Sequence, residues 1–318
     1  MTSTAAISSE YRTITEAAGL LDRSQRGKLA LSGPDAKAFL QGQVSNDVEA
    51  LTPGEGCYAA FLTPKGKMLG DLRILDSGDE LLLDTERVAL QGLFNMISRF
   101  SIGYRAELHK RTLERGLLSL VGPASDSIAR LSGLPEREHA HVPLEIGARS
   151  ARAVRTNVGV DLLCDAADVP ALTAVLQDAG AVPVSEQAVE CLRIELGRPR
   201  YGIDLDETVI PQEAGLNQRA VSFTKGCYVG QETVARLYYR GKPNRHLRGL
   251  RLPAPPTPAD QVRFEGRVVG QLGSVAISPR FGPIALAFVR REVAPGASVS
   301  VGPESSDLAA EVVELPFS

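Results

Sequence analysis

The sequence predicts an α+β fold that ends in a small all-β domain. Its 318 residues exceed the roughly 100 to 200 residues of one ordinary domain, so we expect two or three domains. Strand-like runs in the first third are joined by short turns, which indicates an antiparallel meander rather than a doubly wound parallel sheet. Beyond Pro253 the helical periodicity disappears and short β-like runs alternate with Gly and Pro.

The first part of the chain predicts an α/β domain. Apolar spacing indicates a helix from Ile14 to Leu21, the run KLALSG reads as a short strand, and Pro34 suits the first turn of a second helix. Apolar residues then recur at helical spacing from Val88 to Phe100, which predicts an amphipathic helix against one face of the meander. The meander strands are expected at 57–63, 68–75 and 80–84.

A second series of strands and helices follows, and then the all-β segment. The runs VRFEG, RVVGQLGSVAIS, IALAFVRR, ASVSVG and AAEVVEL predict a barrel or sandwich of roughly 70 residues, which would be marginal alone and should dock on the α/β body. The proline-rich stretch 253–258 is a candidate linker. The second series predicts strands near 117–121, 151–156 and 160–164, and helices near 124–132, 168–179 and 185–196.

Composition narrows the class of protein. Lys and Arg total 35 and Asp and Glu total 38, a net charge of −3 that argues against coating of nucleic acid. Four cysteines form no CxxC pair, which excludes a zinc finger or a disulfide framework and favours a reducing compartment. Without a basic leader or about 18 uninterrupted apolar residues, we expect a cytoplasmic protein with no membrane span. Trp is absent, so a flat ligand must pack on other side chains.

The segment KGCYVGQE, residues 225–232, has the highest density of reactive side chains. Gly226 and Gly230 flank Cys227 and would allow a tight turn that exposes the thiol. Lys225, or the N-terminus of a helix that begins at QETVARL, would favour the thiolate and lower the pKa of Cys227. A small buried cysteine beside Tyr228 fits the spacing equally well. The other three cysteines lie in apolar patterns and are expected in the core.

Charged residues after this segment also have two interpretations. Gln231 and Glu232 suit the solvated first turn of a helix, and Arg236 is spaced to pair with Glu232. From Arg236 to Arg251 the chain carries six Arg or Lys residues and no acidic one. Such a run is most often a solvated face, but it would also suit an acidic protein or the phosphates of tRNA.

KGCYVGQE followed by TVAR resembles the signature of the YgfZ group of folate-binding proteins, relatives of the aminomethyltransferase (T-protein) of the glycine cleavage system. The resemblance implies two interlocked α/β domains in residues 1–244 and a β-barrel in residues 245–318, arranged as a monomeric ring around a channel for tetrahydrofolate. Further stretches agree in order: AGLLDRS at 18–24, FLQGQVSNDV at 39–48, FLTPKGKMLGDLRI at 61–74, RIELGRPRYGIDLDETVIPQEAGL at 193–216 and GSVAISPRFGPIALAFVRR at 273–291.

The resemblance also implies a folate site. Asp204, in YGID, would receive the pterin, because a carboxylate offers two acceptors to the paired N–H donors of that ring edge. Without the family, the same aspartate reads as a turn or cap residue. The basic run could hold the glutamate tail of folate. The other residues assigned to the cofactor are Gln43, Asn46, Asp47, Glu213, Tyr228, Gln231, Glu232 and Arg236.

Two functions follow from the resemblance. The first is a tetrahydrofolate-binding accessory protein for iron–sulfur cluster assembly or repair in client enzymes, affecting tRNA modification through them, with Cys227 and Lys225 as the reactive pair. One thiol cannot hold a cluster that needs four ligands, so no bound cluster is predicted. The alternative is an aminomethyl or methyl transferase. The catalytic Asp of those enzymes is missing, with Gln91 near its expected position, which leaves enzymatic activity open.

Overall fold

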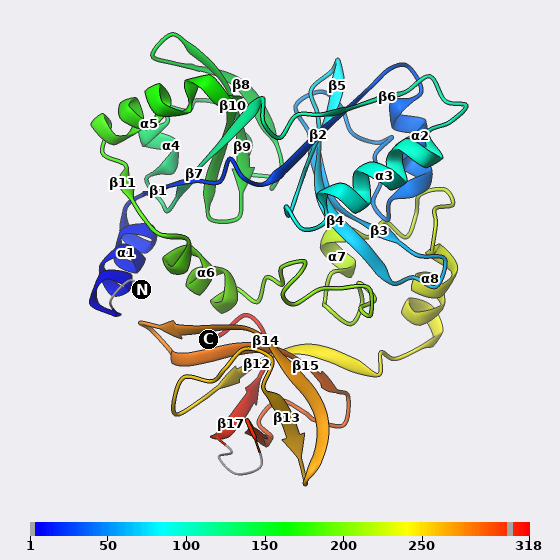
Figure 1. The fold of residues 1–318 in the computed structure, drawn as a ribbon, viewed down its shortest axis with the longest axis vertical. Coiled ribbons are helices and arrows are strands. Elements are labelled where there is room, and N and C mark those ends of the chain that lie inside the picture. Colours follow the sequence, from blue (N-terminus) through cyan, green and yellow to red (C-terminus); the bar gives the residue numbers. More distant parts are fainter. Residues whose placement is uncertain (1–3, 304–307) are drawn as a thin grey trace.

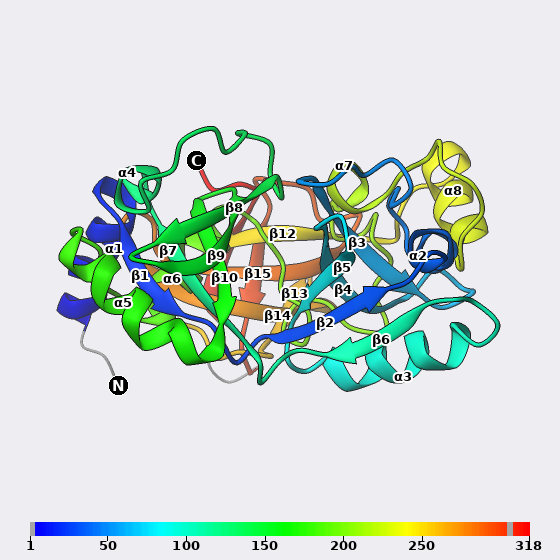
Figure 2. The ribbon, with the colours of Figure 1, turned by 90° about the horizontal axis from the view of Figure 1, so that it is seen from above.

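Two sheets and a barrel surround the middle of the molecule. The computed structural model describes residues 4–303 and 308–318. Figure 1 shows the two α/β domains side by side with the barrel below them, and Figure 2 shows that the three parts form one flat arrangement. The predicted α+β architecture, two interlocked α/β domains and a C-terminal β-barrel, is confirmed. In the described part of the chain no helix is long and apolar enough to cross a membrane.

The first domain is a five-stranded sheet in the order β3-β4-β5-β2-β6. Its meander is confirmed, because short turns join three neighbouring antiparallel strands. Helix α3 (Leu90–Phe100) begins two residues later than its apolar spacing predicts, and Val88 is 68% exposed. Helix α2 (Ala36–Gln43) and α3 pack on the sheet through Phe39 and Leu93. The strands are β2 (Gly27–Ser32), β3 (Gly56–Leu62), β4 (Met68–Asp76), β5 (Glu80–Thr85) and β6 (Glu107–Lys110).

The second domain is a six-stranded sheet in the order β11-β1-β7-β10-β9-β8. Helices α5 and α6 confirm the predicted pair, whereas α4 ends sooner than its apolar run predicts. The strands are β1 (Gly19–Asp22), β7 (Arg115–Val121), β8 (His141–Ile146), β9 (Arg149–Thr156), β10 (Gly159–Asp165) and β11 (Val182–Pro183). The helices are α4 (Ser125–Ile128), the 3-10 turn η1 (Ala166–Asp168), α5 (Val169–Asp178) and α6 (Glu186–Glu195).

Strand β1 corrects one sequence prediction and interlocks the domains. The predicted helix from Ile14 to Leu21 is wrong, because α1 (Thr4–Glu16) ends before Gly19 and the chain then pairs with both β7 and β11. A Cβ atom at Gly19 would lie 2.6 Å from Ile14 Cγ2, so only glycine fits this packing. The N-terminus thus joins the second sheet before residues 27–110 build the first.

The C-terminal domain is a closed barrel in the order β12-β15-β14-β13-β16-β17. Its first strand, β12, lies in the basic run and was missed as a strand, although Leu247 and Leu250 are buried in it. The prolines at 253–258 therefore lie in the loop between β12 and β13 of the barrel domain, and not in a linker between domains. The strands are β12 (Arg245–Arg251), β13 (Gln261–Phe264), β14 (Arg267–Ser278), β15 (Gly282–Arg290), β16 (Ser298–Val301) and β17 (Leu308–Val313).

Polar contacts fix the barrel to the second domain. The Asp204 carboxylate accepts hydrogen bonds from Ser274 N and Oγ, both at 2.8 Å. The Glu195 carboxylate accepts one from Ser278 Oγ, and Glu195 O accepts one from Phe317 N at 2.8 Å. These groups are buried, so each satisfied pair disfavours separation of the barrel from α6.

Candidate functional site

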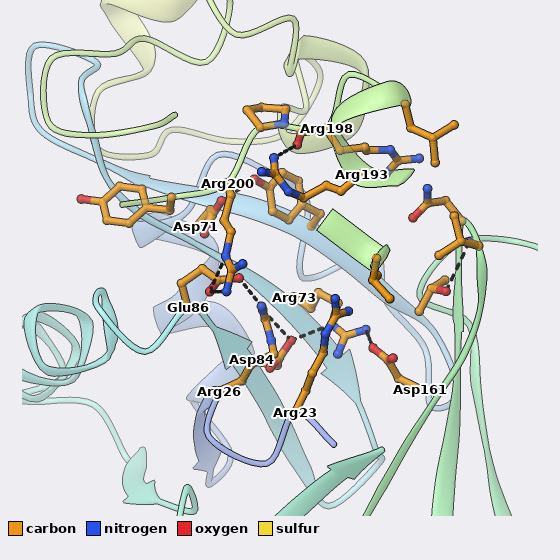
Figure 3. Close-up of a pocket in the computed structure, with 18 of the residues that line it drawn as sticks. Arg23, Arg26, Asp71, Arg73, Asp84, Glu86, Asp161, Arg193, Arg198 and Arg200 are labelled. Carbon is orange, nitrogen blue, oxygen red and sulfur yellow. Dashed lines mark hydrogen bonds and ion pairs between the residues drawn. The ribbon is translucent and has the colours of Figure 1, made fainter. Parts of the chain in front are cut away.

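A polar cavity of about 220 Å³ lies where the two α/β domains meet the segment 198–201 (Figure 3). The connection from β1 to β2, strands β4 and β5, and helix α6 supply its walls. Apolar contributions come from Tyr58, Leu72 and Tyr201. Its charged lining residues are Arg23, Arg26, Asp71, Arg73, Asp84, Glu86, Glu138, Asp161, Glu186, Glu190, Arg193, Arg198, Arg200 and Arg219.

Asp84 is the centre of an ion network at the junction of the two sheets. Arg26 Nε lies 3.0 Å from Asp84 Oδ1, and Arg73 Nε lies 2.8 Å from Asp84 Oδ2. Burial alone would raise the pKa of Asp84, but the two guanidinium groups outweigh it and lower that pKa to about 2. Arg73 also contacts Asp161 of the second domain at 2.6 Å, so this network joins the domains.

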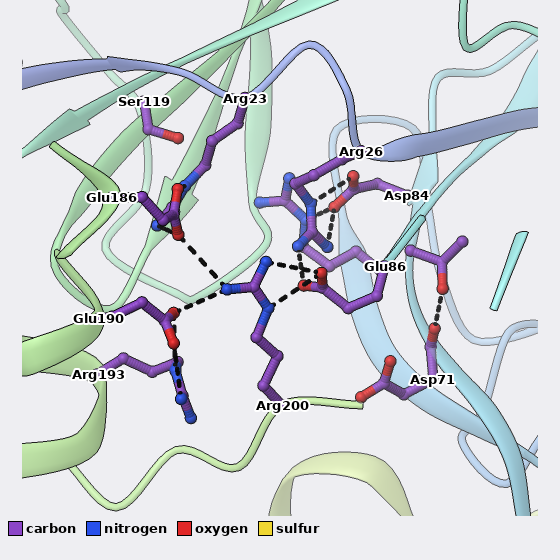
Figure 4. A network of polar contacts seen from close by, with 12 residues as sticks. Arg23, Arg26, Asp71, Asp84, Glu86, Ser119, Glu186, Glu190, Arg193 and Arg200 are labelled. Atoms are coloured by element: carbon purple, nitrogen blue, oxygen red, sulfur yellow. Dashed lines mark hydrogen bonds and ion pairs between the residues drawn. The ribbon is translucent and has the colours of Figure 1, made fainter. Parts of the chain in front are cut away.

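Arg200 crosses the cavity between the same two domains (Figure 4). Its NH2 lies 3.1 Å from Glu86 of the first domain, and its NH1 lies 3.0 Å from Glu190 of the second. Glu86 also pairs with Arg26, and Glu190 pairs with Arg193 at 2.8 Å. Arg200 therefore closes part of the cavity through contacts that a bound ligand could replace.

Asp71 differs from the other carboxylates because no arginine pairs with it. Tyr58 donates a hydrogen bond to Asp71 Oδ2 at 2.6 Å, and none of the described residues provides a partner for Oδ1. Burial raises the pKa of Asp71 to about 6, and the Tyr58 hydrogen bond opposes that shift. The cavity thus contains one carboxylate oxygen that is free to accept hydrogen bonds from a ligand.

Asp204 does not line this cavity. Besides its two bonds from Ser274, its Oδ2 accepts hydrogen bonds from Arg200 N at 2.9 Å and from Arg193 NH1 at 3.1 Å. These partners occupy both oxygens and leave the side chain 1% exposed. The geometry therefore does not support Asp204 as the acceptor for a pterin; the turn interpretation describes it better.

Lys225 is a structural clasp rather than a partner of the thiol. Its Nζ donates to the carbonyl oxygens of Gln41, Val44 and Asn46 at 2.6, 2.8 and 2.7 Å. Burial lowers the pKa of Lys225 to about 8, while Asp47 acts in the opposite direction. Because three carbonyls engage the ammonium, it is not free to stabilise a thiolate, and the predicted Lys225–Cys227 pair is not seen.

The loop at 43–47 lies behind the cavity wall instead of in it. Asn46 Nδ2 donates to Tyr58 O at 2.8 Å and to Arg219 O at 3.1 Å. Asp47 accepts a hydrogen bond from Gln41 at 3.0 Å, and Gln43 is half-buried in α2. The predicted folate residues of this loop therefore support the cavity wall without facing the cavity.

Glu213 also has a bracing role. Its carboxylate accepts a hydrogen bond from Ile210 N at 3.0 Å and lies 3.2 Å from Arg245 Nε of the barrel. Its backbone oxygen accepts a hydrogen bond from Leu247 N at 2.8 Å. The geometry therefore supports a role for Glu213 in bracing its own loop, and not a direct contact with a cofactor.

Cys227 is exposed, whereas the other three cysteines are buried as predicted. Helix α8 (Gln231–Arg240) begins just after it, and Gly230 has a φ of +85° with its Cα too close to Thr63 O for a Cβ. Gly226 has open space and needs no such conformation. The thiol lies outside the central cavity, on the exposed loop that precedes α8.

The remaining predicted residues lie in this loop and on α8. Tyr228 is buried, while Glu232 and Arg236 are exposed on α8. Gln231 is half-buried at the start of the helix. Among residues 4–303 and 308–318 no ion pair joins Glu232 to Arg236, so the predicted pair does not form. None of the four lines the central cavity.

The basic run is divided between α8 and β12. Arg245 is neutralised by Glu213, Arg248 lies 3.0 Å from Glu314, and Arg251 lies 4.0 Å from Glu311. Only its first part remains an exposed basic surface. Next to it Phe223 stacks on Tyr238, with ring centroids 3.9 Å apart.

Sequence reasoning missed the residues that line the cavity, although it quoted the segments that contain them. In MLGDLRIL, Asp71 and Arg73 are two positions apart, so a strand places both on one face. Asp84, in β5, and Glu86, the first residue after it, have the same spacing. Charged residues at alternate positions in apolar strands were the available signal.

Comparison with known proteins shows the family. The GCVT N-terminal domain matches residues 1–225, and the glycine cleavage T-protein C-terminal barrel domain matches residues 245–318. A chloroplastic protein of Arabidopsis thaliana, named as a candidate transferase, is 29% identical over 310 residues, covering 93% of this chain and 71% of that protein. An aminomethyltransferase of Parasynechococcus marenigrum is 32% identical over 331 residues, covering 97% and 89%.

A solved structure shows the same fold. The glycine cleavage system aminomethyltransferase T from Bartonella henselae matches with a TM-score of 0.88 and 24% identity, over 100% of this chain and 91% of that one. Both α/β domains and the barrel are included in that match. The chain belongs to the glycine cleavage T-protein (GCVT) family.

Proposed function

We propose that the central cavity binds tetrahydrofolate and that Asp71 receives the pterin ring. The observation that carries this proposal is the free Asp71 Oδ1 in a buried cavity, beside a second oxygen already held by Tyr58. A carboxylate accepts side-by-side N–H donors of the kind that an aminopyrimidinone presents. Tyr58 and Tyr201 offer apolar walls for a flat ring in a protein without Trp.

The dimensions of the cavity support partial rather than complete enclosure of the ligand. Its volume of about 220 Å³ lies below the roughly 300–1,000 Å³ of sites for drug-sized ligands. Arg200 occupies the space between Glu86 and Glu190, and its displacement would enlarge the cavity. Arg198 and Arg219 line the same cavity and suit the carboxylates of a glutamate tail.

Titration with tetrahydrofolate tests this proposal. We expect saturable heat with the parent protein, a loss of affinity of about tenfold or more in Asp71→Asn, and affinity within about twofold of the parent in Asp204→Asn. The two substitutions remove the same charge, so they are matched. Absence of saturable binding would contradict the proposal. Loss of tetrahydrofolate affinity in Asp204→Asn but not in Asp71→Asn would instead identify Asp204 as the residue that receives the pterin.

We further propose that the protein is a YgfZ-type accessory factor for iron–sulfur enzymes and not a catalyst of one-carbon transfer. Support comes from the exposed thiol of Cys227, which lies outside the cavity and is open to a docked protein. A thiolate there could engage a cluster iron, a persulfide or an oxidised partner. Folate and thiol would then act at two separate places on one chain.

Complementation tests the accessory role. In a strain that lacks its own homologue, the parent chain should restore the activity of iron–sulfur enzymes and Cys227→Ser should not. Ser222→Ala is the control, because Ser222 belongs to the same loop and is not a nucleophilic thiol. Full rescue by Cys227→Ser would remove the cysteine from the mechanism.

Glycine-cleavage transferase activity is the second candidate, favoured by relatives named aminomethyltransferase. Gln91 does not supply the missing acid, because it is exposed on α3 and bonded to Asn95 and Lys110. This part of the chain brings two carboxylates to the cavity: Asp84, which is held between Arg26 and Arg73, and Glu86, just after β5. Formation of methylenetetrahydrofolate from an aminomethylated carrier protein, lost in Glu86→Gln, would establish this function instead.

A further inference from the structure

A second cavity, of about 260 Å³, is lined by strands of both α/β sheets. Strands β2 and β5 of the first sheet and β9 and β10 of the second supply most of its wall. Among the residues that the structure describes, Asp84 alone lines both this cavity and the central one, and Arg26 and Arg73 already neutralise it. The second cavity is therefore a separate compartment behind the ion network.

The inner wall of this cavity is apolar. Leu29, Leu75 and Leu83 are buried beneath it, and the half-buried Leu82 and Leu163 line it from the two sheets. Burying a ligand against such a wall yields roughly 25 cal/mol per Å² of apolar surface. The wall thus favours a ligand with an apolar body.

The lining carries the cations Lys28, Arg111, Arg115 and Arg152 and the carboxylates of Glu80 and Asp84. Burial lowers the pKa of Arg152, and the charge of Glu80 opposes that shift. Arg115 lies 2.6 Å from Asp165, and Arg111 lies 2.7 Å from Glu114. Arg152 forms no ion pair with any residue in the described ranges 4–303 and 308–318. Arg111 Nε is also buried without a hydrogen-bond partner within those ranges.

The one side chain bonded to Arg152 does not neutralise it. Arg152 NH1 donates to His141 Nδ1 at 2.9 Å. Burial, together with the charge of Arg152, lowers the pKa of His141 to about 4, so the imidazole is a neutral acceptor at pH 7. The remaining N–H groups of this guanidinium can therefore pair with an anion from outside the chain.

We propose that this second cavity binds a small amphipathic anion, a compact apolar body with a carboxylate or phosphate head that pairs with Arg152. A guanidinium fork matches either head group. The volume lies just below the range of sites for drug-sized ligands, so the apolar body is a short acyl chain or a single ring. The site is independent of the central cavity and of any folate bound there.

Ligand-induced stabilisation and calorimetry on the full chain test this site. Hexanoate and phenyl phosphate are the probes, with hexanol and inorganic phosphate as analogues that lack the charge or the apolar body. We expect a concentration-dependent rise in Tm and a measurable Kd for at least one probe, and neither effect with the two analogues. Preference for hexanoate or for phenyl phosphate identifies which combination of head group and apolar body the cavity takes.

Variants assign the binding to the cavity. Arg152→Gln should weaken binding about tenfold or more, and Leu82→Phe should do so by filling the cavity while it leaves the charge in place. Arg149→Gln is the matched control on the same strand, since Arg149 is exposed and outside the lining. The proposal would be overturned if Arg152→Gln and Leu82→Phe both bound the probe as tightly as the parent protein does. It would also be overturned if inorganic phosphate stabilised the protein as much as the probes do, or if neither probe had any effect.

Discussion

At the scale of single residues, Asp71 carries a cost in stability that its proposed role explains. A carboxyl whose pKa rises on folding favours the native state less when it is ionised. Its penalty is absent below about pH 4, develops as pH rises towards 6, and is complete at pH 7. Such a cost is common where a group is retained for binding.

Asp71→Asn should therefore stabilise the protein at pH 7 by about 1–3 kcal/mol, because a neutral amide avoids the penalty of burying a charge. Denaturant unfolding at pH 7 and pH 4 measures this, and the gain should disappear at pH 4. An equal gain in the free energy of unfolding at both pH values would mean that the raised pKa of Asp71 is not the source of the gain. A variant that is more stable at pH 7 but binds folate more weakly would show that Asp71 serves binding at the expense of stability.

For substitution of Asp204 we expect the opposite effect, a loss of stability. Removing this buried carboxylate leaves Ser274 N and Arg200 N without their acceptor and takes away one of the two carboxylates that pair with Arg193, so Asp204→Ala should cost about 3–5 kcal/mol. Thermal unfolding compared with Asp206→Ala, an exposed aspartate two positions away, provides the measurement and its control. A cost below 1 kcal/mol would show that the contacts to the barrel carry little energy.

The residue scale was also the hardest to predict from sequence. Asp71 and Asp204 both stand in quoted segments, yet only the packing of distant strands decides which one faces the cavity. For Cys227 the local cues left exposure and burial equally open, and the structure shows exposure, whereas the helix predicted after it starts at the expected residue. The partners of Lys225 are about 180 residues away in the chain, which no local pattern shows.

At the scale of elements, Lys225 completes the C-terminus of α2. The last carbonyl oxygens of a helix have no hydrogen-bond donor within it, and here the Lys225 ammonium donates to those of Gln41 and Val44. The main chain continues the contact, because Val229 N donates to Gly42 O at 3.2 Å. The loop that exposes Cys227 is therefore held by α2.

Lys225→Met should cost about 2–4 kcal/mol, because it leaves three carbonyls unsatisfied near the surface of the core. Hydrogen exchange should show faster opening of residues 220–229 than of the barrel, which has no contact with this side chain. Lys65→Met, at an exposed lysine, is the control. Unchanged exchange in 220–229 would show that the clasp does not order the loop.

Elements stabilised by their neighbours in sequence were predicted best. The meander of β3, β4 and β5 and helix α3 follow from periodicity and short turns. Strand β1 was predicted as helix because its partners β7 and β11 are remote, and β12 was missed because an arginine at every third position concealed its buried leucines. In both cases tertiary pairing outweighed the local signal.

At the scale of the whole molecule, the barrel is a structural support for the α/β body. Ile194 of α6 packs in one cluster with Leu286 and Phe317 of the C-terminal domain. The polar contacts of Glu195 and Asp204 surround this cluster. The α/β part therefore shares both apolar and polar contacts with the barrel.

A chain that ends at residue 244 should lose cooperative folding, because it exposes this cluster and leaves buried carboxylates without donors. Circular dichroism melting and the fraction of soluble protein measure the loss. Ser274→Ala in the full chain should cost only about 1–3 kcal/mol and retain a cooperative transition. A truncated chain that melts as sharply as the parent would show that the barrel is dispensable.

The position of β1 has a consequence for the order in which the molecule forms on the ribosome. Asp22 pairs with Leu118, and Gly19 pairs with Val182, whereas the first sheet needs only residues 27–110. At synthesis rates of about 5–20 residues per second, β1 waits roughly 5 s or more for its first partner. The sheet that begins second in the chain can close first, and the N-terminal strand stays available to chaperones until its neighbours emerge.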